Sequence, residues 1–527
     1  MNRDWDYIII GSGFGGSVSA LRLVEKGYRV LLLEKGRRFA PDDFPKSNWD
    51  LKRWLWLPKL GMRGIFQMTF LPHVTALSGV GVGGGSLVYA NTLPIPKDDF
   101  FAATSWGKLA DWKRELAPHY LTARRMLGAV ENPHSTYPDE VLAQIGKDRG
   151  LEHHPSTVAV YFGKAGVTVP DPFFGGEGPA RTGCIQCGGC MIGCRFGAKN
   201  TLDQNYLYLA EKRGLHLHAE AEVTSVKPLD GGGYSVDALY GLDGKRSDKT
   251  HSAHNVIFSG GVMGTMPLLL ELASRADSLP KISKRLGSYI RTNSEALIGV
   301  ITNRKDVDLS KGIAIGSILQ TDAHSHLEPV RYPAGSGFFR LFNAPHVTGD
   351  DFPTRLARLV TATLRSPWKT ARAYFVRDWA KQTMILLYMR TLEGHLRMQI
   401  GRGVTTGFGR GLVTSVESGP KPTANIPEAA ELANTIAAKI DGKAMTLVTE
   451  TLGGIPTTAH ILGGACMGDS SDTGVIDHRH RVFGYDGLYV IDGSAVSANP
   501  GVNPSLTITA LAERAMTFIP PKAKDLA

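Results

Sequence analysis

The stretch DYIIIGSGFGG, residues 6–16, most constrains the fold, because it joins a short apolar run to closely spaced glycines. Gly11, Gly13 and Gly16 have the spacing GxGxxG between an expected buried strand and a helix. The first glycine permits a tight turn, the second lets the backbone approach a pyrophosphate, and the third lets helix and strand pack closely. A second expected strand, RVLLLEKG, carries Glu34, whose carboxylate can accept hydrogen bonds from ribose hydroxyls. This order predicts an adenine dinucleotide site and leaves NAD and FAD both open.

Two further segments carry glycines and polar residues suited to close contact with a cofactor. GVGVGGGSLVYANTLPIP, residues 79–96, is a glycine-rich loop, and a flavin enzyme needs backbone amides of this kind against the diphosphate and isoalloxazine. At residues 488–516 an expected strand ends in an acid, and the following loop opens a helix whose N-terminus can face a flavin. The candidate contacts from both segments are Gly83, Gly84, Gly85, Ser86, Asn91, Asp492, Gly493, Asn503 and Pro504.

Several motifs occur in the order typical of one flavoprotein family. Two lie near the C-terminus: AHILGGACMG at 459–468 and LYVIDGSAVSANPGVNPSLTITALAERAM at 488–516. A third, VIFSGGVMGTMPLLLEL followed by RLGSYIRTN, lies in the middle of the chain. With the glycine-rich segments, they resemble the glucose-methanol-choline flavoprotein oxidoreductases, and within that family the bacterial cholesterol oxidases. The resemblance implies an α/β fold: a noncontiguous, doubly wound FAD-binding domain, and a substrate domain with an antiparallel sheet backed by helices.

The resemblance also implies how the chain is divided. We expect the FAD-binding domain to be assembled from three separated segments, with substrate-binding regions inserted between them. The expected FAD-binding segments are residues 1–105, 184–294 (including the cysteine-rich loop) and 451–527. The inserted regions are a cap or substrate region at 106–183 and a substrate-binding domain at 295–450.

Three residues receive catalytic roles from the resemblance. His460 in AHILGG corresponds to the family's catalytic histidine, and Asn503 in GVNPSLT to its asparagine partner beside the flavin. The chemistry needs such a pair, because one group must accept or orient the hydroxyl proton while the carbinol hydrogen leaves as hydride. Glu328 in LEPVRYPAGSGFF is the candidate for the glutamate that moves a sterol's double bond after oxidation. The alternative for Glu328 is a strand-edge carboxylate paired with Arg331.

These residues predict an FAD-dependent alcohol oxidoreductase. The substrate that best fits the resemblance is a bulky hydrophobic secondary alcohol of the 3β-hydroxysteroid type, oxidised to its ketone by hydride transfer to flavin N5. Two alternatives stay open: a dehydrogenase for an aromatic or terpenoid alcohol, and a flavin-containing lyase or binding protein without redox turnover. The electron acceptor is either O2 or a redox carrier.

Four of the five cysteines lie in one short segment, CIQCGGCMIGC, at residues 184–194. Cys184, Cys187, Cys190 and Cys194 have the spacing C-x2-C-x2-C-x3-C, the ferredoxin-type run that holds an iron–sulfur cluster. Zinc sites usually combine two C-x2-C pairs that lie about a dozen or more residues apart, which this segment lacks. Some dehydrogenases of the family have a loop that this segment resembles, and in them it carries a three-iron centre beside the flavin. We therefore expect a 3Fe-4S or 4Fe-4S cluster, with zinc or structural cysteines as alternatives.

Charge and apolar patterning bear on partners and location. A net charge of +10 can attract an anionic cofactor, nucleic acid or an acidic membrane, but no nucleic-acid-binding motif is recognised, so nucleic acid is not expected. Segments 46–70 and 351–381 mix basic with apolar side chains, which is typical of helices on an anionic bilayer or of lid helices over an active site. The chain enters a strand directly and has no window apolar enough to span a bilayer. We expect a cytoplasmic protein whose membrane contact is peripheral.

Overall fold

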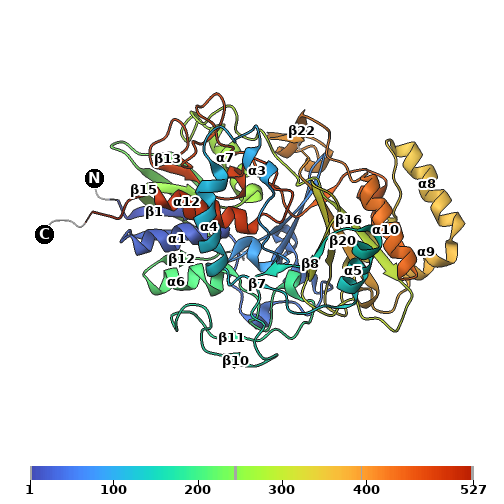
Figure 1. The fold of residues 1–527 in the computed structure, drawn as a ribbon. Helices are drawn as coiled ribbons and strands as arrows, with labels where there is room; N and C mark the ends of the chain where they lie inside the picture. The colour runs from blue at the N-terminus through green and yellow to red at the C-terminus, as the bar shows by residue number, and fades with distance from the viewer. Residues whose placement is uncertain (1–2, 242–245, 393, 524–527) are drawn as a thin grey trace.

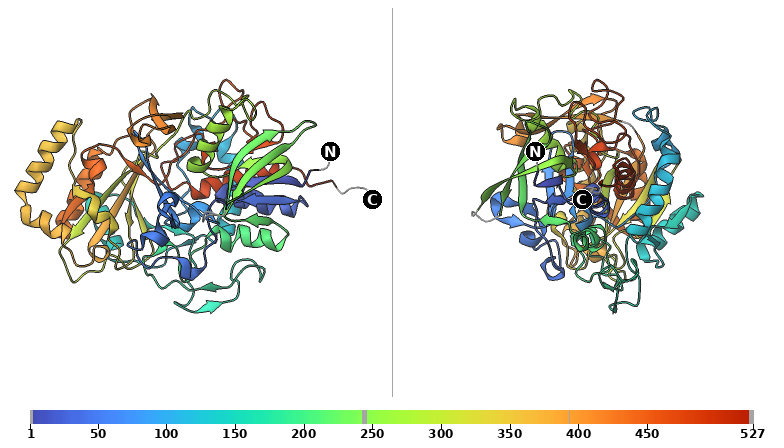
Figure 2. Two further views of the ribbon diagram at one scale, coloured as in Figure 1. Left: turned by 180° about the vertical axis from the view of Figure 1, so that it is seen from behind. Right: turned by 90° about the vertical axis from the view of Figure 1, so that its left-hand side faces the viewer.

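The computed structural model describes residues 3–241, 246–392 and 394–523, which form two lobes placed end to end (Figure 1). Both termini lie on the first lobe, and helices α8 (Phe352–Arg365) and α9 (Pro367–Tyr374) lie at the far end of the second. The view from behind in Figure 2 shows the same elongated arrangement. Parts of the expected domains, at 1–2, 242–245, 393 and 524–527, lie outside the described residues.

The first lobe is built on a seven-stranded sheet in the order β12-β2-β1-β15-β14-β13, with β25 paired to β15. Strands β12, β2, β1, β15 and β25 are parallel, whereas β13 and β14 form an antiparallel extension. The strands are β1 Trp5–Ile10, β2 Val30–Leu33, β12 His216–His218, β13 Ala221–Pro228, β14 Tyr234–Tyr240, β15 Ser247–Phe258 and β25 Leu488–Val490. Every residue of β2 is buried, which explains why its sequence is a continuous apolar run rather than an alternating one.

One hydrophobic core joins this sheet to five helices of at least seven residues. They are α1 Phe14–Glu25, α4 Trp112–Met126, α6 Tyr206–Lys212, α7 Val262–Ala273 and α12 Ser505–Thr517. Helix α4 packs against α12, although it belongs to the segment 106–183 that was expected to form a cap or substrate region. Strand β8 (His153–Pro155), from the same segment, joins the sheet of the second lobe. This segment therefore contributes to both lobes.

The second lobe contains an antiparallel seven-stranded sheet in the order β19-β23-β16-β20-β18-β17-β8. Its strands besides β8 are β16 Ala296–Thr302, β17 Ser317–Gln320, β18 Ser325–Val330, β19 Asn343–Pro345, β20 Thr383–Arg390 and β23 Gly442–Leu447. Apolar residues of this sheet pack with α5 (Tyr137–Arg149) and α10 (Pro427–Lys439) in a second core. The expected α/β fold class, with a noncontiguous dinucleotide-type domain and an antiparallel substrate-type sheet, is confirmed.

A third, three-stranded sheet carries the chain towards the predicted catalytic histidine. It consists of β5 (Phe66–Phe70), β6 (Thr75–Gly79) and β24 (Thr457–Thr458). The remaining elements are α2 Leu51–Trp54, α3 Asp98–Ala102, α11 Val448–Thr451, β3 Trp56–Leu57, β4 Met62–Arg63, β7 Val130–Glu131, β9 Thr157–Val158, β10 Thr168–Val169, β11 Arg181–Thr182, β21 His395–Gly401 and β22 Gly411–Ser418. Among the described residues, no helix combines the length and apolar character needed to cross a bilayer.

Candidate active site

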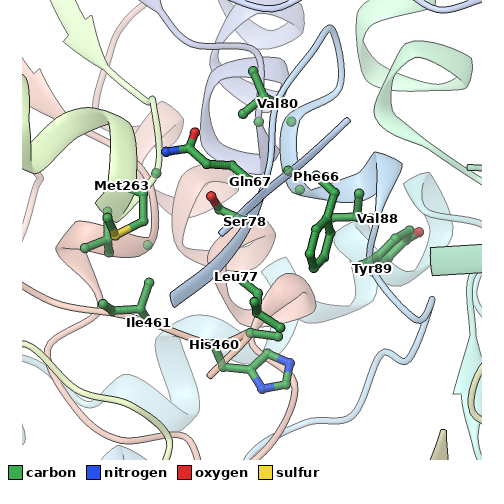
Figure 3. A pocket seen from close by; sticks show the side chains of 18 of the residues that line it. Phe66, Gln67, Leu77, Ser78, Val80, Val88, Tyr89, Met263, His460 and Ile461 are labelled. Carbon is green, nitrogen blue, oxygen red and sulfur yellow. The ribbon is translucent and has the colours of Figure 1, made fainter. Parts of the chain in front are cut away.

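A cavity of about 620 Å³ extends from the carboxyl ends of β1 and β2 to the sheet of the second lobe. The carboxyl ends of parallel strands are where open α/β sheets bind dinucleotides. Figure 3 shows part of the wall, where His460 and Ile461 lie near β5 and β6 residues. Towards the second lobe the lining is apolar, and it includes Phe66, Leu77, Ile315, Val330, Tyr332, Phe339, Trp379, Ile385, Leu387 and Met445.

The glycine fingerprint has the geometry of a cofactor turn. Gly11 has φ +101°, and a Cβ on Gly16 would lie 2.0 Å from the Gly11 carbonyl oxygen, so close packing of α1 on β1 needs both glycines. Gly13 lines the cavity, and a Cβ there would have the Ser259 carbonyl oxygen, at 3.8 Å, as its nearest neighbour. The bare backbone of Gly13 therefore faces the ligand space, and α1 begins at the next residue with its N-terminus beside that space.

Glu34 follows β2 and lies on the cavity wall, 6% exposed. The backbone N–H of Ser12 donates to its Oε2 at 3.0 Å, and the backbone N–H of Gly36 donates to its Oε1 at 2.8 Å. These bonds and a third, from the Ser12 hydroxyl to Oε2 at 2.7 Å, fix the carboxylate, and Oε1 keeps acceptor capacity for a ribose hydroxyl. The position matches the role expected from the sequence.

The second glycine-rich loop packs directly on the first. Gly84 and Gly85 line the cavity, and a Cβ on Gly84 would lie 2.7 Å from the Cα of Gly13. Three residues of this loop that we expected to contact the cofactor are buried behind the lining: Gly83, Ser86 and Asn91. The Ser86 hydroxyl donates to the Gly83 carbonyl oxygen at 2.7 Å, so these two residues hold the loop in shape.

The C-terminal segment completes the cradle. Asp492, Gly493, Asn503 and Pro504 all line the cavity, and α12 begins directly after Pro504. The Asp492 carboxylate accepts the Gly261 N–H at 2.8 Å, and burial raises its pKa. The cavity thus offers two helix N-termini, two bare glycine loops and the Glu34 carboxylate. Flavin adenine dinucleotide requires this set of donors and acceptors, so the residues present fit FAD.

His460 is held by a buried carboxylate. Its Nδ1 lies 2.6 Å from Oε2 of Glu295, whose side chain is 1% exposed, whereas the His460 side chain is 12% exposed. Burial opposes the charged imidazole, but Glu295 outweighs it and raises the pKa of His460. Asn503 Nδ2 lies 3.4 Å from His460 Nε2, so the structure brings the two predicted catalytic residues together on the cavity wall.

Glu328 lies within β18 and is completely buried. Its Oε2 lies 3.4 Å from Nδ2 of Asn503, and its Oε1 lies 3.4 Å from Nε2 of His326. The alternative of a strand-edge pair with Arg331 is wrong, because β18 lies between β17 and β20 and Arg331 pairs instead with Asp139, at 3.3 Å. The structure thus groups the three predicted catalytic residues, although Glu328 itself lies behind the cavity lining.

The four-cysteine segment does not have the geometry of a metal centre. Cys184, Cys187, Cys190 and Cys194 are all free thiols, and in the described part of the chain no three His, Cys, Asp or Glu side chains are arranged to hold an ion. Burial raises the pKa of Cys184 to about 12 and that of Cys187 to about 11, so these free side chains are protonated at neutral pH. These side chains do not fit the expected iron–sulfur cluster, because spacing alone did not bring the sulfurs around one point.

Comparison with known proteins establishes the family. The family model for GMC oxidoreductase matches residues 5–289 in its N-terminal part and residues 405–512 in its C-terminal part, together more than half of the chain. The chain belongs to the GMC oxidoreductase family. This GMC oxidoreductase is an FAD-dependent enzyme that oxidises a CH–OH group, which settles the choice between NAD and FAD.

Two relatives of this GMC oxidoreductase match it over nearly its full length. It is 44% identical to the cholesterol oxidase of Acinetobacter baumannii over 533 residues, covering 99% of the chain and 95% of the relative. It is 45% identical to the cholesterol oxidase of Mycobacterium tuberculosis (strain ATCC 25618 / H37Rv) over 539 residues, covering 99% and 92%. The crystal structure of pyridoxine 4-oxidase from Mesorbium loti has the same fold, with a TM-score of 0.65 over 98% of this chain and 99% of that one, at 14% identity.

The sequence did not reveal two residues that shape the site. Glu295 follows the family segment RLGSYIRTN, but no spacing rule places it beside a histidine 165 residues away. Gly15 lies inside the glycine fingerprint, and a Cβ there would lie 1.7 Å from the Ile491 carbonyl oxygen. The doubled glycine at residues 15 and 16 was the available signal for this second close contact.

Proposed function

We propose that this GMC oxidoreductase oxidises the 3β-hydroxyl of a steroid to a ketone. The observation that carries the proposal is a continuous cavity in which His460 and Asn503 stand between the dinucleotide cradle and an apolar chamber. A sterol is a rigid apolar body with one hydroxyl, so it needs an apolar chamber that ends at a hydrogen-bonding pair. The two cholesterol oxidases, at 44% and 45% identity, support the same substrate class.

FAD, when bound, supplies a hydride acceptor at N5 of its isoalloxazine. The side chains of this protein orient the substrate and take its proton. Glu295 holds the Nδ1–H of His460, which leaves Nε2 as the acceptor for the substrate's hydroxyl proton. Asn503 Nδ2, 3.4 Å from that nitrogen, can donate to the hydroxyl oxygen and so fix the carbinol carbon. The apolar chamber excludes water from this exchange.

Glu328 is the residue that we assign to moving the double bond of an unsaturated sterol. A new ketone makes the neighbouring C–H acidic, and a nearby carboxylate can remove that proton and return it further along the conjugated system. The contact of Glu328 Oε2 with Asn503 Nδ2, at 3.4 Å, supports this assignment. O2 is the electron acceptor in this proposal, since the relatives at 44% and 45% identity are oxidases.

The test is anaerobic addition of alcohols to the holoenzyme while the flavin absorbance is recorded. We expect 3β-hydroxysteroids to bleach the flavin and to yield the 3-ketone, with peroxide formed once O2 is admitted. Bleaching by an aromatic or terpenoid alcohol but not by a steroid would move the enzyme to the alternative substrate class. A flavin that stays oxidised with every alcohol would favour a non-redox role.

An anionic bilayer is the proposed source of the steroid. No residue of α8 is buried, and Phe352, Leu356, Val360 and Leu364 repeat every fourth position at 41–72% exposure. Trp368 on α9 continues this apolar stripe at 79% exposure. Exposed basic residues lie on the same two helices: Arg358, Arg365, Lys369 and Arg372. Such an amphipathic surface can lie in the headgroup region of an anionic membrane.

The same apolar surface continues inward to the cavity. The short 3-10 helix Phe338–Phe342 exposes Leu341 by 63% and Phe342 by 47%, while Phe338 is buried and Phe339 lines the cavity. Trp379, which follows α9, also lines the cavity. A steroid leaving a bilayer at this end would therefore meet apolar side chains from the surface to the site of oxidation.

A further inference from the structure

Two buried carboxyl groups hold the segment that ends in the catalytic histidine. Glu295 accepts the Ala459 N–H at 2.6 Å as well as contacting His460 Nδ1 at 2.6 Å. Glu450, on α11, accepts the Thr457 N–H at 3.0 Å. The two residues are 1% and 4% exposed, so neither carboxyl can rely on water to satisfy its oxygens.

The hydroxyl of Thr446 identifies the protonation state of Glu450. Its Oγ1 lies 2.8 Å from the Leu297 carbonyl oxygen and also contacts Oε2 of Glu450. A carbonyl oxygen can only accept, so both contacts of the Thr446 hydroxyl are hydrogen bonds only when its single hydrogen goes to Leu297. The contact with Glu450 is then a hydrogen bond only if Glu450 carries a proton and donates it.

The surroundings of Glu450 act in the same direction. Burial raises the pKa of Glu450 to about 7, despite the hydrogen bond from the Thr457 N–H that lowers it, and the Glu295 charge adds to the rise. Glu295 differs, because it accepts hydrogen bonds from two N–H groups, those of Ala459 and His460. The charge of Glu295 in turn favours the protonated form of His460. Two carboxyls whose environments differ in this way take different protonation states and different tasks.

We propose that Glu295 is an ionised positioning residue, which sets the tautomer and basicity of His460, and that Glu450 is a protonated anchor of the same segment. The first half rests on the proposed function, because it assigns His460 the substrate's proton. The second half concerns Glu450 alone and does not depend on turnover. Because Glu450 is neutral in this proposal, it does not repel the buried, negatively charged carboxylate of Glu295.

Infrared spectra of the holoenzyme at pH 6, where ordinary glutamates are ionised, test the second half. Glu450→Gln should remove a carbonyl band of a protonated carboxylic acid, and Glu295→Gln should leave that band in place. A wild-type minus Glu450→Gln difference spectrum without such a band would overturn the assignment. Should Glu450→Gln fail to fold, a pH titration of the wild-type band replaces it, and a band already absent at pH 6 overturns the assignment equally.

The pH profile of kcat/KM tests the first half. Removing the Glu295 charge lowers the pKa of His460, so the imidazole stays neutral to lower pH, and the acid limb in Glu295→Gln should move to lower pH by about one unit. We expect kcat to fall about tenfold or more while KM changes little, because the weaker base acts only after binding. Glu431→Gln, an exposed glutamate on α10, is the control and should leave the limb in place.

An unmoved acid limb in Glu295→Gln would overturn the positioning role. Complete lack of steroid turnover in the wild type would instead contradict the proposed function, and the infrared result would still decide the state of Glu450.

Discussion

At the scale of single residues, the site depends on contacts between groups far apart in the chain. Glu295 and His460 are 165 positions apart, and Glu328 and Asn503 are 175 apart. The glycine fingerprint could be predicted from sequence, because its glycines lie at a fixed spacing within one turn between a strand and a helix. The Glu295 contact could not, because it arises only when the second lobe packs against the segment after β24.

Glu328→Gln should separate oxidation from double-bond migration. The amide keeps the shape of the carboxyl but cannot take up a proton, so an unconjugated ketone should accumulate while flavin reduction stays within about tenfold of wild type. Ultraviolet absorbance of the conjugated enone, measured against total ketone, distinguishes the two products. Enone formation at the full rate would remove Glu328 from this role.

Gly15→Ala should cost both stability and cofactor retention. The new Cβ would lie 1.7 Å from the Ile491 carbonyl oxygen, so α1 must shift away from the loop that carries Asp492. We expect a loss of about 3 kcal/mol in unfolding free energy and a lower FAD content in the purified protein. Ser19→Ala, one turn further along α1, removes only a hydroxyl bonded to the Gly15 carbonyl oxygen and is the control. Equal FAD content in the two variants would contradict the steric account.

At the scale of elements, helix α8 and the cysteine segment show which structural features a local sequence pattern can predict. The amphipathic pattern at residues 351–381 correctly predicted helices, and the structure adds that the apolar face of α8 is exposed rather than packed. The cysteine spacing matched a cluster motif, but a cluster needs sulfurs that converge on one point, and spacing does not determine backbone path. Patterns within one element were therefore more informative than the chemistry of a loop.

The exposed stripe of α8 should drive binding to anionic vesicles. The double variant Val360→Asp/Leu364→Asp places two charges on the apolar face, so its partition onto vesicles of phosphatidylcholine and phosphatidylglycerol should fall by at least about tenfold. Leu121→Asp, at a 69% exposed position on α4, is the matched control and should bind as wild type does. Equal binding of both variants, or binding indifferent to lipid charge, would contradict the membrane surface.

The cysteine segment should behave as thiols. All five cysteines should react with a thiol reagent after unfolding without reductant, and the purified holoenzyme should contain iron and acid-labile sulfide well below one atom per flavin. Three or four irons per flavin would restore the cluster and make the segment an electron exit. Fewer than five thiols would indicate a disulfide that the structure does not contain.

At the scale of the whole molecule, each lobe supplies part of the proposed mechanism. The first lobe and the C-terminal segment provide the FAD cradle, His460 and Asn503, while the second lobe provides Glu295, Glu328 and most of the apolar chamber. The noncontiguous fold could be predicted because its motifs are spread along the chain in family order. The boundaries at 106–183 were harder to place, because α4 and β8 of that segment join different lobes.

The most direct test of the central claim is anaerobic stopped-flow flavin reduction by cholesterol, compared with cholesterol deuterated at C3. The account predicts that cholesterol bleaches the flavin in a single turnover and that deuterium slows this step, because the C3 hydrogen leaves as hydride while His460 takes the hydroxyl proton. Flavin that stays oxidised, or that is bleached equally fast by both forms, would contradict it.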